Sequence, residues 1–127
     1  MSVITGGSRG IGFATALSLA SEGWDIALCS RDEAEAVQAA RVISDQFGVQ
    51  ALGDEADVAD GDAMASFAER VGNEWDSVDL LMCNAAVLGP VGPLARVDPL
   101  ALERSIEINF LGVINTIRSF WKMLTVG

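Results

Sequence analysis

Short, continuous apolar runs alternate along the chain with stretches in which apolar residues recur every three or four positions. The first pattern is typical of buried strands and the second of amphipathic helices. The runs predict strands at residues 3–4, 24–29, 49–52 and 78–83. The periodic stretches predict helices at residues 13–21, 36–47, 64–75 and 99–123. Strands and helices in this alternation form right-handed β-α-β units, so we expect a parallel sheet with helices on both faces.

The α/β alternation favours a Rossmann-type fold, in which a sheet lies between two helical layers and the first four strands take the order 3-2-1-4. A chain of 127 residues is long enough for one compact domain. No linker-like segment interrupts the alternation. We therefore expect residues 1–127 to form a single domain of this three-layer αβα type.

The composition excludes several classes of partner. The chain has 18 acidic and 8 basic residues, and the resulting net charge of −10 repels nucleic acids and anionic membrane surfaces. No apolar stretch approaches the roughly 18 residues that cross a bilayer, and no basic segment leads into an apolar one at the first residues. We expect a cytoplasmic protein that binds neither nucleic acid nor membranes.

The residue types that are missing exclude several chemistries. The chain contains no histidine and no tyrosine, so a Ser-His pair and a tyrosine acid or base are ruled out. Cys29 and Cys83 fall on strands that the predicted order places roughly 10 Å apart, beyond the roughly 7 Å that a disulfide spans. We expect two free cysteines and no metal site, because zinc sites use histidine or clustered cysteine ligands.

A glycine-rich segment joins the first predicted strand to the first predicted helix, with the sequence Thr5-Gly6-Gly7-Ser8-Arg9-Gly10-Ile11-Gly12. Backbone N–H groups and the positive end of the helix face the same space at such a turn, which favours phosphate binding. Gly6 would permit the tight turn, Gly10 the close approach of a pyrophosphate, and Gly12 close packing of the helix.

Four segments together resemble the short-chain dehydrogenase/reductase family. Residues 5–12 match the family signature Thr-Gly-x-x-x-Gly-x-Gly in full. Asp57-Val58 corresponds to the Asp that follows the third strand, Cys83-Asn84-Ala85-Ala86 to Asn-Asn-Ala-Gly, and Asn109-Phe110-Leu111-Gly112 to Asn-x-x-Gly. Cys83 and Ala86 depart from the family pattern, whereas Asn84 and Ala85 keep it.

This resemblance implies that the chain binds a nicotinamide dinucleotide. Asp57 would contact adenine, and Asn109 would be the catalytic asparagine that orients a lysine and a water molecule. The implied cofactor-binding residues are Thr5, Gly6, Ser8, Arg9, Gly10, Ile11, Gly12, Arg31, Asp57, Val58, Asn84 and Ala85.

Two arginines bear on the choice of cofactor. In these folds an arginine after the second strand accommodates the 2′-phosphate of NADP, whereas an acidic residue binds the ribose hydroxyls of NAD. Here Arg31 follows the second predicted strand, and Arg9 lies in the glycine loop. We expect a preference for NADP(H). NAD(H) is the alternative, with Arg31 as a solvated charge and Asp32 as a ribose ligand or a helix cap.

The family transfers hydride between nicotinamide and a carbonyl or alcohol, using a Ser and a Tyr-x-x-x-Lys besides the asparagine. Here Arg118 stands four residues before the only lysine, Lys122. The sequence thus resembles the cofactor-binding half of 3-oxoacyl-carrier-protein reductases, truncated before the fifth strand. We expect an NADP(H)-binding portion of an oxidoreductase that is inactive by itself. The alternative is a non-catalytic interaction or regulatory protein that keeps the fold.

The last two predicted elements carry more apolar surface than a monomer usually exposes. In the family, the last helix commonly packs against its counterpart in a neighbouring subunit. Strand 78–83 would have an unpaired edge without a fifth strand. One face of helix 99–123 carries Leu102, Ile106, Phe110, Val113, Ile117 and Trp121, and a second carries Ile108, Leu111 and Ile114. We expect a homo-oligomer formed through this helix and this strand edge.

Overall fold

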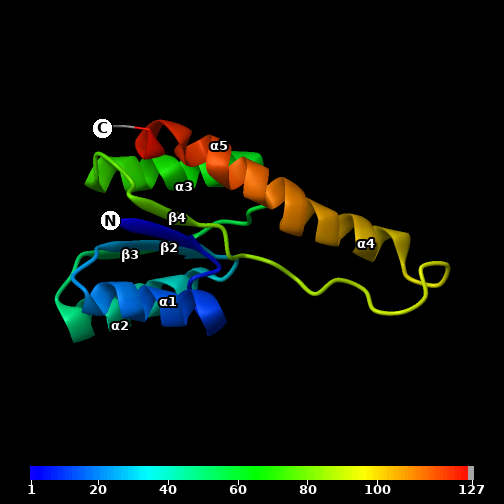
Figure 1. Cartoon of the computed structure of the whole chain (residues 1–127), viewed down its shortest axis with the longest axis horizontal. Helices are drawn as coiled ribbons and strands as arrows, with labels where there is room; N and C mark the ends of the chain where they lie inside the picture. Colours follow the sequence, from blue (N-terminus) through cyan, green and yellow to red (C-terminus); the bar gives the residue numbers. More distant parts are fainter. Residues whose placement is uncertain (126–127) are drawn as a thin grey trace.

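A parallel sheet lies between two layers of helices in the computed structural model, which describes residues 1–125 (Figure 1). The elements are β1 (Ser2–Thr5), α1 (Gly10–Ser21), β2 (Ile26–Ser30), α2 (Glu33–Phe47), β3 (Ala51–Glu55), α3 (Gly61–Glu74), β4 (Leu80–Met82), α4 (Pro99–Ile106), a π-helical turn η1 (Glu107–Leu111) and α5 (Gly112–Leu124). The sheet order is β3-β2-β1-β4, with every pair parallel. The predicted α/β class, layering and strand order are confirmed.

The centre of the sheet is β1, which pairs with β2 on one side and β4 on the other. Val3 is opposite Ala27 and Leu81, and Ile4 is opposite Leu28. The chain leaves β1 toward β2 and later crosses to β4, so the connections diverge at the carboxyl ends of β1 and β4. This divergence opens the crevice in which open α/β sheets bind ligands.

The two faces of the sheet bury separate clusters. Side chains of Ile4 and Leu28 pack under α1 and α2, whereas Val3 and Ala27 pack under α3 and α5. Figure 1 shows α1 and α2 on one side of the strands and α3 and α5 on the other. The second cluster includes Phe67 of α3 and Phe120 of α5, whose rings meet edge to face with centroids 5.6 Å apart.

Helix ends follow local signals in the sequence. Aspartate side chains accept backbone hydrogen bonds at the N-termini of α2, α3 and α4, and these caps are Asp32, Asp60 and Asp98. Gly48 ends α2 in the left-handed conformation that glycine adopts without strain. The strand boundaries are less accurate: β3 begins and ends later than residues 49–52, and β4 is shorter than residues 78–83.

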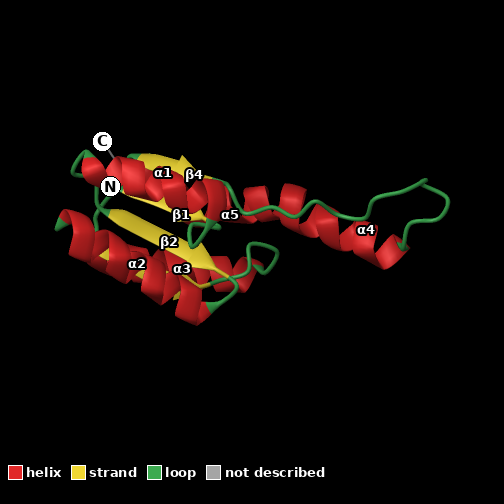
Figure 2. Ribbon diagram, turned by 90° about the horizontal axis from the view of Figure 1, so that it is seen from below, coloured by secondary structure: helices red, strands yellow, loops and turns green. Residues whose placement is uncertain are grey.

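The predicted helix 99–123 is interrupted by the π-helical turn η1, which carries Asn109. Apolar periodicity does not reveal such a turn, because the π-helical turn adds only one residue to a helix that otherwise continues. Its buried stripe also differs from the apolar faces seen in the sequence: Ser105, Ile108, Gly112, Thr116 and Phe120 face the interior. Most of the bulky apolar residues face outward, and α4 with the preceding loop projects beyond the sheet (Figures 1 and 2).

Both cysteines are free, as expected: Cys29 is buried and Cys83 half-buried. Burial raises the pKa of the Cys29 thiol to about 12. None of the helices in residues 1–125 is long and apolar enough to cross a membrane.

Close contact between α2 and the edge strand β3 depends on Gly53. A Cβ atom there would lie 2.0 Å from the carbonyl oxygen of Ala36. We expect Gly53→Ala to lower the free energy of unfolding by about 1–3 kcal/mol, because the helix must move away from the strand. Urea denaturation measures this change.

The matched control is Gly72→Ala within α3, where the nearest atom to the new Cβ is the Met123 sulfur at 3.8 Å. We expect this variant to be as stable as the parent or up to about 1 kcal/mol more stable, because alanine favours a helix over glycine. Equal stability of Gly53→Ala and the parent chain would contradict the proposed contact.

Candidate functional site

The exits of β1 and β4 are joined through one hydroxyl group. Thr5, which is 1% exposed, accepts hydrogen bonds at Oγ1 from the backbone N–H groups of Asn84 (3.0 Å) and Ala85 (3.1 Å). The side chain of Asn84 donates from Nδ2 to the carbonyl oxygen of Gly6 (3.1 Å). The segment after β4 is therefore fixed directly against the glycine loop.

The glycine loop has no room for side chains on its inner side. A Cβ at Gly12 would lie 2.4 Å from the Gly6 oxygen and 2.5 Å from Asn84 Nδ2. Gly6 and Gly10 have φ angles of 64° and 60°, in the region that favours glycine. Nothing lies within 4 Å of a Cβ built on Gly10. The backbone at Gly10 therefore faces open space, as the approach of a phosphate group requires.

The start of α1 also differs from the starts of α2, α3 and α4, which aspartate side chains cap. Its N-cap residue is Arg9, whose side chain makes no capping hydrogen bond. The first N–H groups of an α-helix have no partner within the helix and carry a partial positive charge. The first turn of α1 can therefore bind an anionic group from a ligand.

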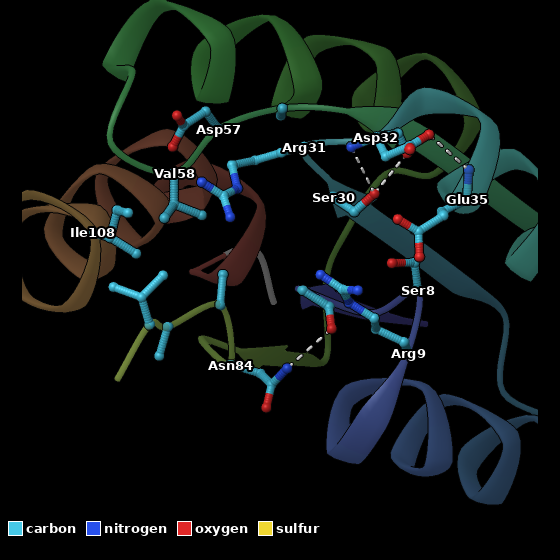
Figure 3. A pocket seen from close by; sticks show the side chains of 15 residues that line it. Ser8, Arg9, Ser30, Arg31, Asp32, Glu35, Asp57, Val58, Asn84 and Ile108 are labelled. Carbon is cyan, nitrogen blue, oxygen red and sulfur yellow. Dashed lines mark hydrogen bonds between the residues drawn. The ribbon is translucent and has the colours of Figure 1, made fainter. Parts of the chain in front are cut away.

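A cavity of about 510 Å³ opens beside this loop (Figure 3). Its volume lies within the range of small-molecule sites. The walls come from the glycine loop, from the segments after β2, β3 and β4, and from η1. The lining residues are Gly6, Ser8, Arg9, Ser30, Arg31, Asp32, Glu35, Ala56, Asp57, Val58, Asn84, Ala85, Ala86, Val87 and Ile108.

Two positively charged side chains, Arg9 and Arg31, line this cavity although the chain is acidic. Neither Arg9 nor Arg31 forms an ion pair within the described part of the chain. The side chain of Arg31 extends across the cavity toward Asp57 and Val58 (Figure 3). The Asp32 carboxylate accepts the N–H of Glu35 (3.1 Å), so it caps α2. The two arginines are thus available to a ligand with negative charge.

Asp57 forms the opposite side of the cavity. Its Oδ1 accepts the N–H of Ala59 (3.0 Å), and its Oδ2 accepts from Arg104 Nη2 of α4 (2.6 Å). Partial burial alone would raise the pKa of this carboxyl group. The two hydrogen bonds and the charges of Arg104 and Arg31 outweigh burial and lower the pKa of Asp57 below its ordinary value. Asp57 is therefore a carboxylate at neutral pH.

Asn109 lies outside the cavity lining, in the π-helical turn. Its side chain accepts from the N–H of Val87 and donates to the carbonyl oxygen of Val87, both at 2.8 Å. Pairing both amide atoms with one residue fixes the loop after β4 against η1. A π-helical turn of this kind often occurs at functional sites.

The structure brings most of the candidate residues together. Gly6, Ser8, Arg9, Arg31, Asp57, Val58, Asn84 and Ala85 line the cavity. Thr5 and Gly12 instead belong to the contact between the glycine loop and the β4 exit, and Gly10 and Ile11 lie at the exposed start of α1. The sequence interpretation missed Ser30, Glu35, Ala56, Val87, Ile108 and the Asp57 partner Arg104. Local pattern gave no signal for Arg104, because it reaches Asp57 from 47 residues away.

The family model of the short-chain dehydrogenases matches residues 1–127, the whole chain. The chain belongs to this family.

Among curated relatives, cis-4-hydroxycyclohexanecarboxylate dehydrogenase of Sinomonas cyclohexanicum is 40% identical over 114 residues, 89% of this chain and 45% of that protein. A 3-ketoacyl-ACP reductase from Sinorhizobium meliloti superposes with a TM-score of 0.92 at 30% identity, covering 96% of this chain and 48% of that one. An alcohol dehydrogenase from Thermococcus sibiricus, complexed with 5-hydroxy-NADP, gives 0.91 at 32% identity, covering 96% and 52%. The chain thus spans about half the length of these related proteins.

Replacing Thr5 with valine tests the junction between β1 and β4. Valine keeps the shape but removes the acceptor of two backbone N–H groups. The Asn84 N–H keeps the Met82 carbonyl oxygen as an acceptor (3.1 Å), whereas the Ala85 N–H loses Thr5 Oγ1, so we expect the free energy of unfolding to fall by about 1–3 kcal/mol. Chemical denaturation measures the loss. Thr5→Ser keeps the hydroxyl group and should lose about 1 kcal/mol for the missing methyl. Equal losses in both variants would rule out the hydroxyl as the stabilising group.

Proposed function

We propose that this chain binds a nicotinamide dinucleotide in the cavity beside the glycine loop and prefers NADP(H) to NAD(H). The observation that carries the proposal is the pair of free guanidinium groups, Arg9 and Arg31, that face one cavity of a strongly acidic chain. A 2′-phosphate is the part of NADP that NAD lacks, and arginine is the side chain best suited to bind it.

The remaining parts of the dinucleotide fit the other walls of the cavity. The pyrophosphate would lie over Gly10 at the start of α1, where a Cβ is absent and the N–H groups are uncapped. The adenine amino group would donate to Asp57, beside Val58. Asn84 and Ala85 would flank the ribose on the nicotinamide side. The Thermococcus alcohol dehydrogenase was solved with an NADP derivative, and a xylitol dehydrogenase that superposes with a TM-score of 0.90 was solved with NAD+.

We propose that residues 1–127 are the cofactor-binding portion of a larger Rossmann-type domain that catalyses hydride transfer to or from a carbonyl or alcohol. A bound nicotinamide ring supplies or accepts the hydride. Asn109 would help to arrange the proton donor. These residues include no tyrosine, so we expect them to leave the proton transfer step without its acid or base and to show no turnover by themselves.

A regulatory or interaction protein that keeps the fold is the second candidate function. The observation that favours it is the exposed apolar face of the long helix, the continuous segment formed by α4, η1 and α5. A measurable affinity for a dinucleotide separates the two candidates, because only the first requires a working cofactor site.

Arg31→Ala tests the cofactor preference. We expect the affinity for NADPH to fall by about 1–3 kcal/mol, which is about 5- to 150-fold, because a charged hydrogen bond to phosphate is lost. The affinity for NADH should change little. Fluorescence titration of the reduced cofactors measures both affinities.

The control for Arg31→Ala is Arg41→Ala, which removes an exposed arginine of α2 outside the cavity. It should leave both affinities unchanged. Equal weakening of NADPH and NADH by Arg31→Ala would show that this side chain does not read the 2′-phosphate.

We also propose that the chain associates with a second copy through α4, α5 and the edge of β4. Bulky apolar side chains of the long helix remain in contact with solvent, among them Ile106, Phe110, Ile117 and Trp121. Within the described residues, β4 pairs with β1 on one side alone. An apolar helix face beside an unpaired strand edge favours a symmetric contact that covers both.

Ile117→Glu tests this contact. Ile117 is 37% exposed on α5, so a charge there is tolerated in a monomer but would be buried without a partner in a dimer. We expect light scattering to give twice 13.3 kDa for the parent chain and 13.3 kDa for the variant. The control is Val37→Glu on α2, which is 39% exposed and should stay dimeric. A monodisperse parent mass of 13.3 kDa would refute the proposal.

A further inference from the structure

Two arginines, Arg104 and Arg31, act on the Asp57 carboxylate in different ways. Arg104 forms a direct ion pair with Asp57 through Nη2 and Oδ2, 2.6 Å apart. Arg31 lowers the pKa of Asp57 through its charge but forms no ion pair with it. Both Asp57 and Arg31 line the cavity, and Figure 3 shows Arg31 extended toward Asp57.

The loop that carries Asp57 is held by the long helix at three points. Besides the Arg104 pair, Asn115 Nδ2 donates to the carbonyl oxygen of Val58 (2.9 Å). Gly112 packs so closely on Val58 that a Cβ there would lie 2.6 Å from Val58 Cγ2. Arg104 also forms an ion pair with Glu107, three residues further along the helix, with 3.5 Å between Nη1 and Oε2. The position of the Asp57 carboxylate is thus fixed from the helix side of the loop.

A free carboxylate beside Arg31 would compete for it. Guanidinium and carboxylate groups pair readily in two-point geometry, and a phosphate would then have to displace the carboxylate. Among residues 1–125, Arg31 has no ion-pair partner, while Asp57 is paired with Arg104. The ion pair between Asp57 and Arg104 therefore leaves Arg31 free to bind a ligand.

We propose that Arg104 is a specificity-determining residue for the dinucleotide site: by holding the Asp57 carboxylate, it leaves Arg31 free to bind a 2′-phosphate. Arg104 does not line the cavity, so it acts through Asp57 as a positioning residue. This inference rests on the proposed function, since it assumes that the cavity binds the adenosine half of a dinucleotide.

The test measures adenosine 2′,5′-bisphosphate and adenosine 5′-monophosphate by titration calorimetry, which isolates the 2′-phosphate from the rest of the cofactor. The readout is the ratio of the two affinities. Arg104→Met should lower this ratio by about tenfold, because Asp57 then pairs with Arg31. Arg104→Lys keeps a cation beside Asp57 and should retain most of the ratio. Arg118→Met removes an exposed arginine of α5 that forms no ion pair within residues 1–125, and it should leave the ratio unchanged.

The double variant Arg104→Met/Asp57→Asn separates this role from a structural one. With the competing carboxylate gone, the ratio should return to within about threefold of the parent value, although both ligands bind more weakly without the adenine contact. Asp57→Asn alone should keep or raise the ratio, and this measurement stands even if Arg104→Met does not fold. A lowered ratio in Asp57→Asn, or no restoration in the double variant, would overturn the inference.

The outcomes also separate this inference from the function on which it rests. If the parent chain binds neither adenosine ligand, or binds both equally, the proposed NADP(H) site is wrong. If the parent prefers the bisphosphate and Arg104→Met keeps that preference, the site stands and the role of Arg104 is wrong.

Discussion

The close approach of the β1 exit, the start of α1 and the β4 exit is the constraint on which the site depends. Three backbone segments meet where neither Gly6 nor Gly12 has a side chain, and the Asn84 amide fills the remaining space. The Thr5 hydroxyl accepts from the N–H groups of Asn84 and Ala85 at the β4 exit, and the Met82 carbonyl oxygen also accepts from that of Asn84. The outer side of the loop is open at Gly10, since nothing lies within 4 Å of a Cβ built there, and a ligand can approach the backbone from that side.

The cavity contains two positively charged side chains although the whole chain is strongly negative. A net charge of −10 would repel a dinucleotide phosphate at long range, yet the site places two cations beside the glycine loop. Of the three acidic residues that line the cavity, two are engaged: Asp32 caps α2, and Asp57 pairs with Arg104. Within the described residues, Arg9 and Arg31 form no ion pair with any of the three.

The long helix contributes to the site and to the surface through opposite faces. Its buried stripe is small or polar where it meets the Asp57–Val58 segment, because Gly112 allows close contact and Thr116 satisfies its hydroxyl by donating to the Gly112 carbonyl oxygen (2.7 Å). Its bulky residues face outward instead. The exposed apolar face, Asn109 and the residues that hold the Asp57–Val58 segment therefore lie on the same helical segment.

The sequence by itself determined the class of fold, the strand order and the position of the glycine loop. These follow from apolar periodicity and from glycine spacing, both of which involve residues that are close together in the sequence. It also placed Arg31 and Asp57 at strand ends that meet at one edge of a parallel sheet. The role of Asp32 was open in the sequence, since a carboxylate before a helix can either cap it or bind ribose, and the hydrogen bond to Glu35 shows the cap.

Only the tertiary structure decided the partner of Asp57, the π-helical turn and the buried face of the long helix. Arg104 is one of seven arginines, and its pairing with Asp57 depends on how α4 crosses the loop after β3. The face that a helix buries is normally its most apolar one, but here close packing against Val58 selects the glycine face. Such outcomes depend on which elements meet and at what distance, and neither quantity is encoded in the local pattern of one segment.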